Sequence, residues 1–409
     1  MNAHFTFGSA GCRLRTMQSR KVKCLIGFAV GILLFGPTVC PVQATFTSLY
    51  IFGDGASTTT NNTVGPANFY YGQRYSNGRV WVELLAQELG LTNNYWYSNN
   101  SSIHLSYTNL SASSTNWSYS SNNWSFYGDY SPVLLTNLNH FTTPQDSNTA
   151  LFVVWVNDAD FVGDMGNIYP STNIVTWTNA INQSLTNHWR IITNLYYAKG
   201  ARTLIMPKAV DITEIPRYDK SPAADKRFIR QRIIDFNAAF TALLNQARAS
   251  LPGITIYEPD VFSLLDNVLT NAAAYGLTNA LYNGQSIDAV DDPVLSNKSL
   301  NGPGTNYIFW DPTDPTAKFQ AVFADVVEQL IAPAQITNVS VLEDDCQLGV
   351  ASLPIGLNGF VDGCTNLVLA NWTTRASFNS TGATQTIVVP TSGPLWFYRL
   401  RFPYAWSWP

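Results

Sequence analysis

Four short apolar runs between residues 49 and 257 constrain the fold most strongly. Each is rich in aromatic or β-branched residues and is not interrupted by polar residues, as in parallel strands buried on both faces. Segments with apolar residues at steps of three and four separate the last three runs. Strands that alternate with helices build a parallel sheet covered by helices, so we predict an α/β fold. The runs are LYIF (49–52), LFVVWV (151–156), TLIM (203–206) and ITIY (254–257).

Two of the intervening segments are predicted amphipathic helices. The first, 177–200, ends at Gly200, and its apolar face comprises Ile181, Leu185, Trp189, Ile192 and Tyr196. The second has Ser221 as its expected N-cap and Pro222 at its first position. Its inward-facing residues are expected to be Phe228, Ile233, Phe236, Phe240 and Leu244.

Residues 1–44 have the pattern of a cleaved signal peptide. Five basic residues precede the apolar core CLIGFAVGILLFGPTVC, and Val42 and Ala44 are the small residues that a signal peptidase requires. The core is short for a bilayer span and contains Gly36-Pro37, which favours a signal over an anchor. We therefore expect a secreted, periplasmic or extracellular protein with no membrane span in the mature chain.

The charge of the chain argues against nucleic acids and anionic membranes as partners. Charged residues make up only 12% of the chain, the formal net charge is −4, and the mature part contains no basic run. Asn, Ser and Thr take the place of charge, most densely in residues 92–131, which show no clear period. We interpret that stretch as a long surface insertion near the loop end of the sheet.

The sequence changes character after residue 332. Residues 336–409 combine Val, Thr and Gly alternation with turns, so we predict a small all-β module after a main domain of residues 45–332. Cys346 and Cys364 in this module either form a disulfide or remain as two buried thiols; with no neighbouring His they are poor evidence for a metal site. The aromatic end LWFYRLRFPYAWSWP packs the module or offers a stacking surface for sugars or another protein.

Five blocks of the main domain occur in an order that resembles the GDSL lipases and esterases of the SGNH hydrolase superfamily. The resemblance implies an SGNH-hydrolase-like (flavodoxin-like) parallel sheet sandwiched by helices, and hydrolysis of acyl or acetylated-sugar esters without a cofactor or metal. The blocks are FGDGAST (52–58), YSNGRVWVELLAQELGL (75–91), FVVWVNDADF (152–161), AKGARTLIMPKAVDITEIPRY (198–218) and FWDPTDPTAKFQAVFADVV (309–327).

The oxyanion-binding positions of this family are retained. The resemblance assigns Gly78 as the backbone N–H donor of the second block and Asn157 as the side-chain donor of the third. Asp158 follows Asn157 as the pattern expects, although Trp155 stands where Gly is usual.

The nucleophile and the base of the family are not retained. Gly55 follows Asp54 where the family has its serine, and Asp314 follows Asp311 at the spacing where the family has its histidine. A serine hydroxyl reacts only when an imidazole takes its proton, and a carboxylate is a far weaker base unless it is strongly buried. Ester hydrolysis by the Ser–His mechanism is therefore expected to be impaired or lost.

Substitutes for these two groups are poorly placed. Ser57, the alternative nucleophile, is turned through roughly 200° if a helix starts there, so capping explains it better, and Thr58 and Thr59 meet similar objections. His104 and His140 lie in or near the insertion and are the plausible replacements for the base. The remaining histidines are His188, expected as a surface or packing residue, and His4 in the signal.

The acidic residues allow a different chemistry. Asp54, Asp158, Asp311 and Asp314 can converge at the carboxyl ends of the strands, where carboxylates bind Ca²⁺ or hydrolyse glycosidic bonds. We favour the simpler alternative, in which Asp311 and Asp314 shape a turn and cap the helix that starts near Thr316.

Three functional hypotheses follow. The leading one is a secreted, catalytically impaired ester hydrolase-like protein. The second is a non-catalytic extracellular protein that binds a small ester or glycan or acts in adhesion. The third is a hydrolase with an unrecognised nucleophile.

Overall fold

The computed structural model describes residues 46–402 except 60–68, 73, 90, 92–121, 343–344, 354–357, 368–370 and 391–395. The predicted signal peptide, His4, His104 and residues 403–409 therefore lie outside the described residues. The rest divides into two compact units whose boundary falls between residues 333 and 334.

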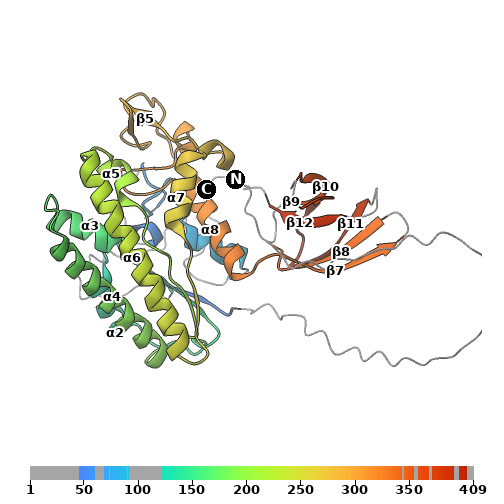
Figure 1. The fold of residues 1–409 in the computed structure, drawn as a ribbon, viewed down its shortest axis with the longest axis horizontal. Coiled ribbons are helices and arrows are strands. Elements are labelled where there is room, and N and C mark those ends of the chain that lie inside the picture. The colour runs from blue at the N-terminus through green and yellow to red at the C-terminus, as the bar shows by residue number, and fades with distance from the viewer. Residues whose placement is uncertain are drawn as a thin grey trace, which may run out of the picture. The chain divides into compact units, whose positions relative to one another are not determined.

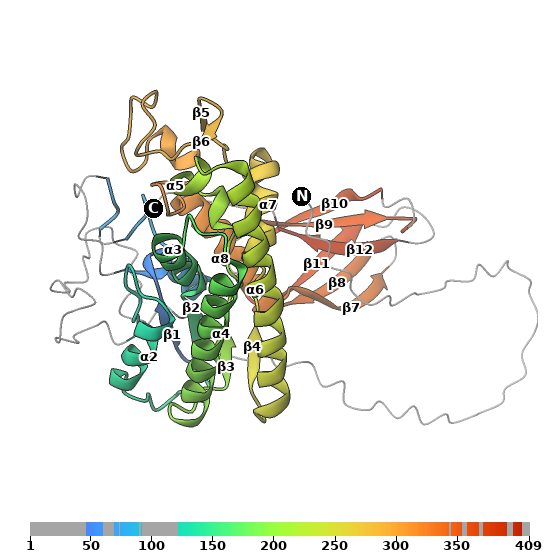
Figure 2. The ribbon, with the colours of Figure 1, turned by 60° about the vertical axis from the view of Figure 1, so that its left-hand side comes forward.

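The first unit is built on a parallel sheet, which confirms the predicted α/β fold. Its strands are β1 (Leu49–Gly53), β2 (Leu151–Trp155), β3 (Thr203–Ile205) and β4 (Thr255–Tyr257), in that order across the sheet (Figure 2). Every residue of β1 and β2 is buried, so both faces of the sheet are covered. The four apolar runs thus correspond to the four strands.

Helices form the layers over this sheet. Helices α2, α4 and α6 lie side by side (Figure 1), while α1 packs against α8. Trp81 of α1 and Phe323 of α8 lie 4.5 Å apart between ring centroids, and Phe323 lies 5.0 Å from Trp155 of β2. The helices include α1 (Trp81–Glu88), α2 (Ser131–His140), α3 (Asn157–Asn167), α4 (Ile174–Tyr197), α5 (Pro216–Asp219), α6 (Ala223–Ser250), α7 (Val261–Thr270) and α8 (Ala317–Ile331).

Helix α4 is present, but its predicted buried face is partly wrong. It starts at Ile174, three residues before the predicted start, with Asn173 as its side-chain cap, and Gly200 follows its end with a φ of +73°. Leu185, Trp189 and Tyr196 are only half-buried. Polar residues with hydrogen-bond partners take their place on the buried face, which includes Trp177, Ile181, Ser184, Asn187, His188, Ile191, Ile192 and Leu195.

Helix α6 starts one residue later than predicted. Pro222, not Ser221, is its N-cap residue, and it provides no side-chain hydrogen bond. Phe228 is half-buried. The other four predicted inward-facing residues are buried: Ile233, Phe236, Phe240 and Leu244.

The prediction of a surface insertion over residues 92–131 is wrong for its last part. Residues 122–126 are buried and run along the free edge of β1. The Trp124 N–H donates to the Ile51 carbonyl at 2.7 Å, and the Phe126 N–H donates to the Gly53 carbonyl at 3.1 Å. This stretch is held by pairing with the edge of the sheet, although Asn and Ser dominate the residues around it. Residues 92–121 lie outside the described part of the chain.

The second unit confirms the small all-β module. Two antiparallel sheets, β11-β8-β7 and β10-β9-β12, enclose a core that includes Leu348, Val361 and Val389. The strands are β7 (Gln335–Leu342), β8 (Asp345–Ala351), β9 (Asn358–Cys364), β10 (Thr373–Asn379), β11 (Thr384–Pro390) and β12 (Phe397–Arg401).

Two open questions about this module are answered for its described residues. Cys346 and Cys364 are both free buried thiols, so the structure has the unpaired alternative. In β12, Tyr398 and Leu400 pack against the core, whereas Arg399 and Arg401 donate to the carboxylate of Asp362.

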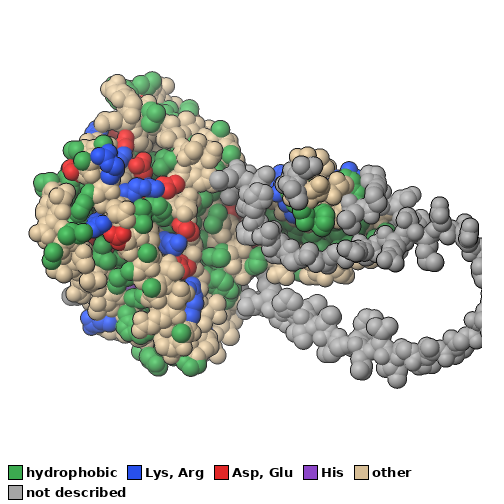
Figure 3. Space-filling view, in the orientation of Figure 1, with side chains coloured by type: hydrophobic (Ala, Val, Ile, Leu, Met, Phe, Trp, Pro, Cys, Tyr) green, Lys and Arg blue, Asp and Glu red, His purple; other side chains and the backbone are tan. Residues whose placement is uncertain are grey.

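The surface matches the low charge of the sequence. On the face drawn in Figure 3, acidic and basic side chains are interspersed among uncharged ones. Across the described residues, none of the helices combines the length and the apolar character needed to cross a bilayer.

Candidate functional site

Gly55 and Asp314 face each other beyond the carboxyl end of β1. A Cβ atom built on Gly55 would lie 3.6 Å from Oδ1 of Asp314. Asn157 follows β2 directly, at the same edge of the sheet, where open α/β sheets place their sites. The positions that the family resemblance assigns to nucleophile and base are therefore neighbours, and they hold no hydroxyl and no imidazole.

The turn after β1 directs Ser57 into the core. Residues Gly55–Ser57 form a single 3-10 turn, and Oδ1 of Asp54 caps it by accepting from the Ala56 N–H at 3.1 Å. Ser57 is fully buried, and its Oγ accepts from Nε1 of Trp81 at 3.1 Å. Asp54 thus has the capping role that was expected of Ser57. Thr58 and Thr59 are also buried and bonded, to Ser125 and Asn123.

Asp311 and Asp314 form a tight turn before α8. Oδ1 of Asp311 accepts from the backbone N–H groups of Thr313 at 2.8 Å and Asp314 at 2.7 Å. Oδ2 of Asp311 accepts from the Tyr70 hydroxyl at 3.0 Å. Thr316 caps the helix, because its Oγ1 accepts from the Phe319 N–H. The two acids therefore shape the turn, as expected, while the cap itself comes from Thr316.

Burial controls the protonation of these acids. Asp311 and Asp314 are 4% and 5% exposed. Burial, together with the neighbouring Asp311 carboxylate, raises the pKa of Asp314 well above its usual range, and burial also raises the pKa of Asp311. Gly55 offers no hydroxyl that a base at position 314 could deprotonate, so the two positions do not form a nucleophile–base pair.

Two further acids belong to the same edge. Asp54 is half-buried, and burial raises its pKa to about 7. Burial and the nearby Asp54 raise the pKa of Asp158 well above its usual range, and its Oδ1 accepts from the Val210 N–H at 2.7 Å. Among the described residues, no three His, Cys, Asp or Glu side chains are grouped so that they could hold a metal ion.

The Asn157 side chain joins two strand ends. It is 1% exposed, and its Nδ2 donates to the carbonyl of Pro207, just after β3, at 2.8 Å. Its Oδ1 has no hydrogen-bond partner in the described structure. Its role as an oxyanion donor, which the family resemblance implies, stays a prediction.

The segment around Gly78 is tied to the chain after Asp314. Gly78 is buried, and the preceding Asn77 accepts from the Ala317 N–H at 2.8 Å while donating to the Leu300 carbonyl at 2.9 Å. Besides Asp314, two aromatic residues lie within 4 Å of a Cβ built on Gly55: Tyr75, three residues before Gly78, and Tyr127.

Tyr127 is the site residue that sequence reasoning missed. Its ring stacks on Tyr75 with centroids 4.7 Å apart, and its Cδ2 would lie 3.1 Å from a Cβ on Gly55. Trp124 and Phe126 alternate with polar residues just before Gly128, which is a strand-and-turn signal. That signal was available, but the Asn- and Ser-rich surroundings concealed it.

A serine and a histidine do meet elsewhere, inside helix α4. Oγ of Ser184 lies 3.4 Å from Nδ1 of His188 and donates to Asp160. Nδ1 of His188 also lies 2.9 Å from the Ser184 carbonyl, which can only accept, so this nitrogen is a donor. His188 is 1% exposed, packs against Phe236 and Phe240, and has its pKa lowered by burial. It is a packing residue, as one alternative predicted.

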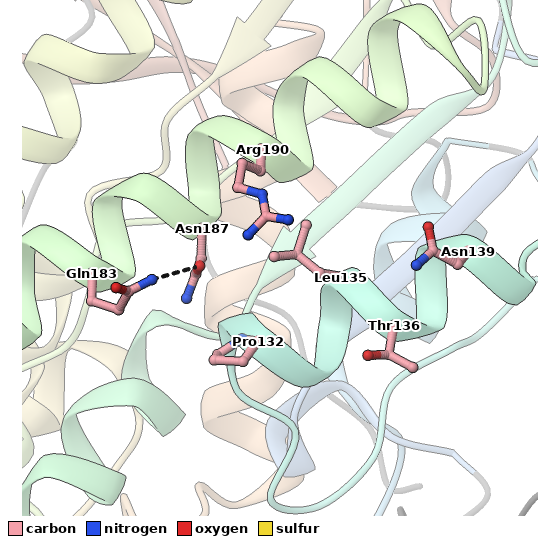
Figure 4. Close-up of a pocket in the computed structure, with 7 residues that line it drawn as sticks. All are labelled: Pro132, Leu135, Thr136, Asn139, Gln183, Asn187 and Arg190. Carbon is pink, nitrogen blue, oxygen red and sulfur yellow. Dashed lines mark hydrogen bonds between the residues drawn. The ribbon is translucent and has the colours of Figure 1, made fainter.

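The exposed His140 and the groove between α2 and α4 both lie away from the predicted site residues. His140 is exposed at the end of α2, and His104 lies outside the described residues. A groove of about 440 Å³ lies between α2 and α4 (Figure 4), and none of the predicted site residues lines it. Its lining consists of Pro132, Leu135, Thr136, Asn139, Gln183, Asn187 and Arg190.

Comparisons with known proteins place these observations in context. No family model matches the chain. Two GDSL esterase/lipases of Arabidopsis thaliana are 24% and 23% identical to it over 325 and 342 residues, which cover 71% and 73% of this chain and 91% and 89% of theirs. Among solved structures, an α/β hydrolase enzyme from the metagenome of Lake Arreo, Spain, is 12% identical with a TM-score of 0.38, over 70% of this chain and 95% of that one.

Proposed function

We propose that this chain, which is related to the GDSL esterases and lipases, is a secreted hydrolase-like protein. It binds a small ester or an acetylated sugar without cleaving it. One observation carries this proposal. The two side chains that would form the reactive pair are adjacent, yet one is glycine and the other is a buried carboxyl group. Ester cleavage by this scaffold needs a hydroxyl beside an imidazole.

The remaining groups suit binding. Asn157 has a side-chain amide, and burial raises the pKa of the Asp314 carboxyl group, which favours its neutral, hydrogen-bond-donating form. Tyr75 and Tyr127 provide aromatic rings beside the Gly55 position. Neutral, oxygen-rich ligands match this set better than anionic ones, because burial raises the pKa values of Asp54, Asp158 and Asp314.

Hydrolysis is tested on the purified mature chain with p-nitrophenyl acetate, p-nitrophenyl butyrate and a fluorophosphonate probe. We expect release of p-nitrophenol no faster than for Ser57→Ala and no covalent labelling. Saturable turnover that Ser57→Ala abolishes would overturn the loss of catalysis and support the third hypothesis.

Binding is tested separately, on immobilised acetylated and deacetylated xylan. Retention on the acetylated polymer that Tyr75→Ala weakens several-fold would support the proposal. Equal retention of both proteins on both polymers would contradict it. Secretion is tested by fusing residues 1–44 to a reporter protein and measuring its export.

A further inference from the structure

The ring of Tyr127 fills the space above Gly55. Its Cδ2 is 3.1 Å from where a Cβ on Gly55 would lie, and the ring stacks on Tyr75 at 25° between ring planes. Gly55 and Tyr75 are both buried beneath it. Among the described residues, the Tyr127 ring is the group nearest to the space that a side chain at position 55 would occupy.

The backbone that carries Tyr127 is anchored on both sides. The Phe126 N–H donates to the Gly53 carbonyl at 3.1 Å, and the Asp129 N–H donates back to the Phe126 carbonyl at 3.0 Å to close the turn. Asp129 is 1% exposed and accepts from Nδ2 of Asn137 at 2.7 Å. The ring therefore has a fixed attachment point at the edge of β1.

The side chain itself is much less constrained than its backbone. Tyr127 is 44% exposed, although its neighbours Phe126 and Asp129 are buried. Gly128 has a φ of +81°, and a Cβ there would meet no atom of the described structure within 4 Å. Rotation about the side-chain bonds of Tyr127 can thus move the ring into solvent while the anchors stay in place.

The groups beneath the ring define what would replace it. Tyr75 offers a flat face, and Oδ1 of Asp314 lies 3.6 Å from the Cβ position of Gly55. The Thr313 hydroxyl donates to Oδ2 of Asp314 at 2.8 Å, and the Tyr70 hydroxyl donates to Oδ2 of Asp311 at 3.0 Å. A planar face bordered by hydrogen-bonding groups suits a hydroxylated six-membered ring, and the ring of Tyr127 is such a group.

We infer that Tyr127 is a displaceable plug and that the ligand of the site around Gly55 presents a hydroxylated six-membered ring, which takes the place of the Tyr127 ring on Tyr75. The ligand class rests on the proposed binding function, whereas the closure by Tyr127 does not. Asp54, Asp311 and Asp314 then border the incoming ring.

The closure is tested by thiol accessibility in the mature chain with Gly55→Cys. Removing the plug with Tyr127→Ala is expected to raise the modification rate of Cys at position 55 by iodoacetamide about tenfold, the upper range expected for one aromatic stacking contact. Tyr130→Ala is the matched control, because Tyr130 is similarly exposed, at 46%, but is the residue just before helix α2 and is not among the neighbours of the Gly55 position. The unmodified chain, with Cys346 and Cys364 buried, gives the background. Equal rates with and without Tyr127 would overturn the closure.

The ligand class is tested by refilling the space. In the Gly55→Cys/Tyr127→Ala chain, p-cresol, the tyrosine side chain as a free molecule, is expected to restore slow modification, and methyl glucopyranoside is tested beside it. Protection by p-cresol alone indicates an aromatic ring, and protection by the glucoside indicates a sugar ring. Protection by neither would overturn the ligand class while leaving the closure intact.

A second measurement of the closure does not depend on Gly55→Cys, which is needed if that variant does not fold. Nitration of Tyr75 by tetranitromethane is compared between Tyr127→Ala and the wild type and mapped by mass spectrometry. No increase over the wild type would overturn the closure.

Discussion

The backbone N–H of Asp314 donates to Oδ1 of Asp311 at 2.7 Å, and the Asp311 carboxylate helps burial to raise the pKa of the Asp314 carboxyl group. The turn holds the two residues together, because Oδ1 of Asp311 also accepts from the Thr313 N–H. Two buried carboxyl groups thus stand where the related enzymes are expected to have a histidine and its orienting carboxylate, and they make the stability of the first unit depend on pH.

Asp314→Asn is expected to stabilise the first unit above neutral pH. The pKa of Asp314 is higher in the folded state than its ordinary value of 3.8, so its stabilising effect is complete below that pH and is lost as the pH rises toward the folded-state pKa. An amide keeps a hydrogen-bond donor without the charge. Thermal unfolding followed by circular dichroism between pH 4 and 9 should give curves that separate as the pH rises, and parallel curves would contradict the assignment.

Glu328 and Asp325 on helix α8 are expected to have the same effect at a second place. Burial raises the pKa of Glu328 from 4.5 to about 8 and that of Asp325 to about 7, so stability should fall between about pH 4.5 and 8. Glu328→Gln should reduce this slope. Asp345→Asn, at an exposed carboxylate of the second unit, is the control and should leave the slope unchanged.

The second unit is expected to respond to pH in the opposite direction. Burial on its own would raise the pKa of Asp362, but hydrogen bonds from Arg401 and Thr374 outweigh it and lower the pKa below the ordinary value of 3.8. Its stabilising effect is therefore present above 3.8 and is lost as the pH falls through the folded-state pKa. Asp362→Asn should destabilise this unit by about 1.5–3 kcal/mol at pH 7, the usual worth of hydrogen bonds to a charged group. Calorimetry should show a lower unfolding temperature for the second unit, while the unfolding transition of the first unit stays unchanged.

Ser57→Ala is expected to lower stability without affecting chemistry. The change leaves the buried Nε1 of Trp81 without its acceptor, which typically costs about 1–3 kcal/mol. Urea unfolding measures the loss, and Ser263→Ala at an exposed position should cost far less. A loss of ester turnover with unchanged stability would instead mark Ser57 as a nucleophile.

Glu83→Gln is expected to be the most destabilising of these changes. Arg74 and Glu83 form an ion pair in which the two side chains are 5% and 0% exposed, and breaking such a pair costs about 3–5 kcal/mol. The control is Asp235→Asn, which breaks the ion pair between Arg232 and Asp235. The Asp235 side chain is 46% exposed, so this change should cost about 1 kcal/mol at most. Guanidinium unfolding at pH 7 compares the two, and equal losses would contradict the burial argument.

The sheet was predictable because its strands are apolar on both faces and need no tertiary information to be found. The buried face of α4 was not, because Ser184, Asn187 and His188 are buried through specific hydrogen bonds that a count of hydrophobic residues cannot register. Residues 122–126 were missed for a related reason, since only their pairing with β1 makes a polar stretch into an edge of the sheet.

In the candidate site, the identities at positions 55 and 314 followed from the family resemblance, and the structure brings these positions together. The raised pKa of Asp314 did not follow, because it depends on burial that appears only in the folded chain. The stacking of Tyr127 on Tyr75 likewise joins two segments with no pattern in common.

The candidate site joins early and late segments of the first unit. Tyr70 reaches Asp311 across 241 positions, and Ser76 reaches Pro315 across 239. Loop-closure entropy makes contacts of such long range late events in folding. During synthesis Tyr70 and Ser76 therefore lack these partners until nearly the whole unit has left the ribosome. Ligand binding at this site would then require a completely folded unit.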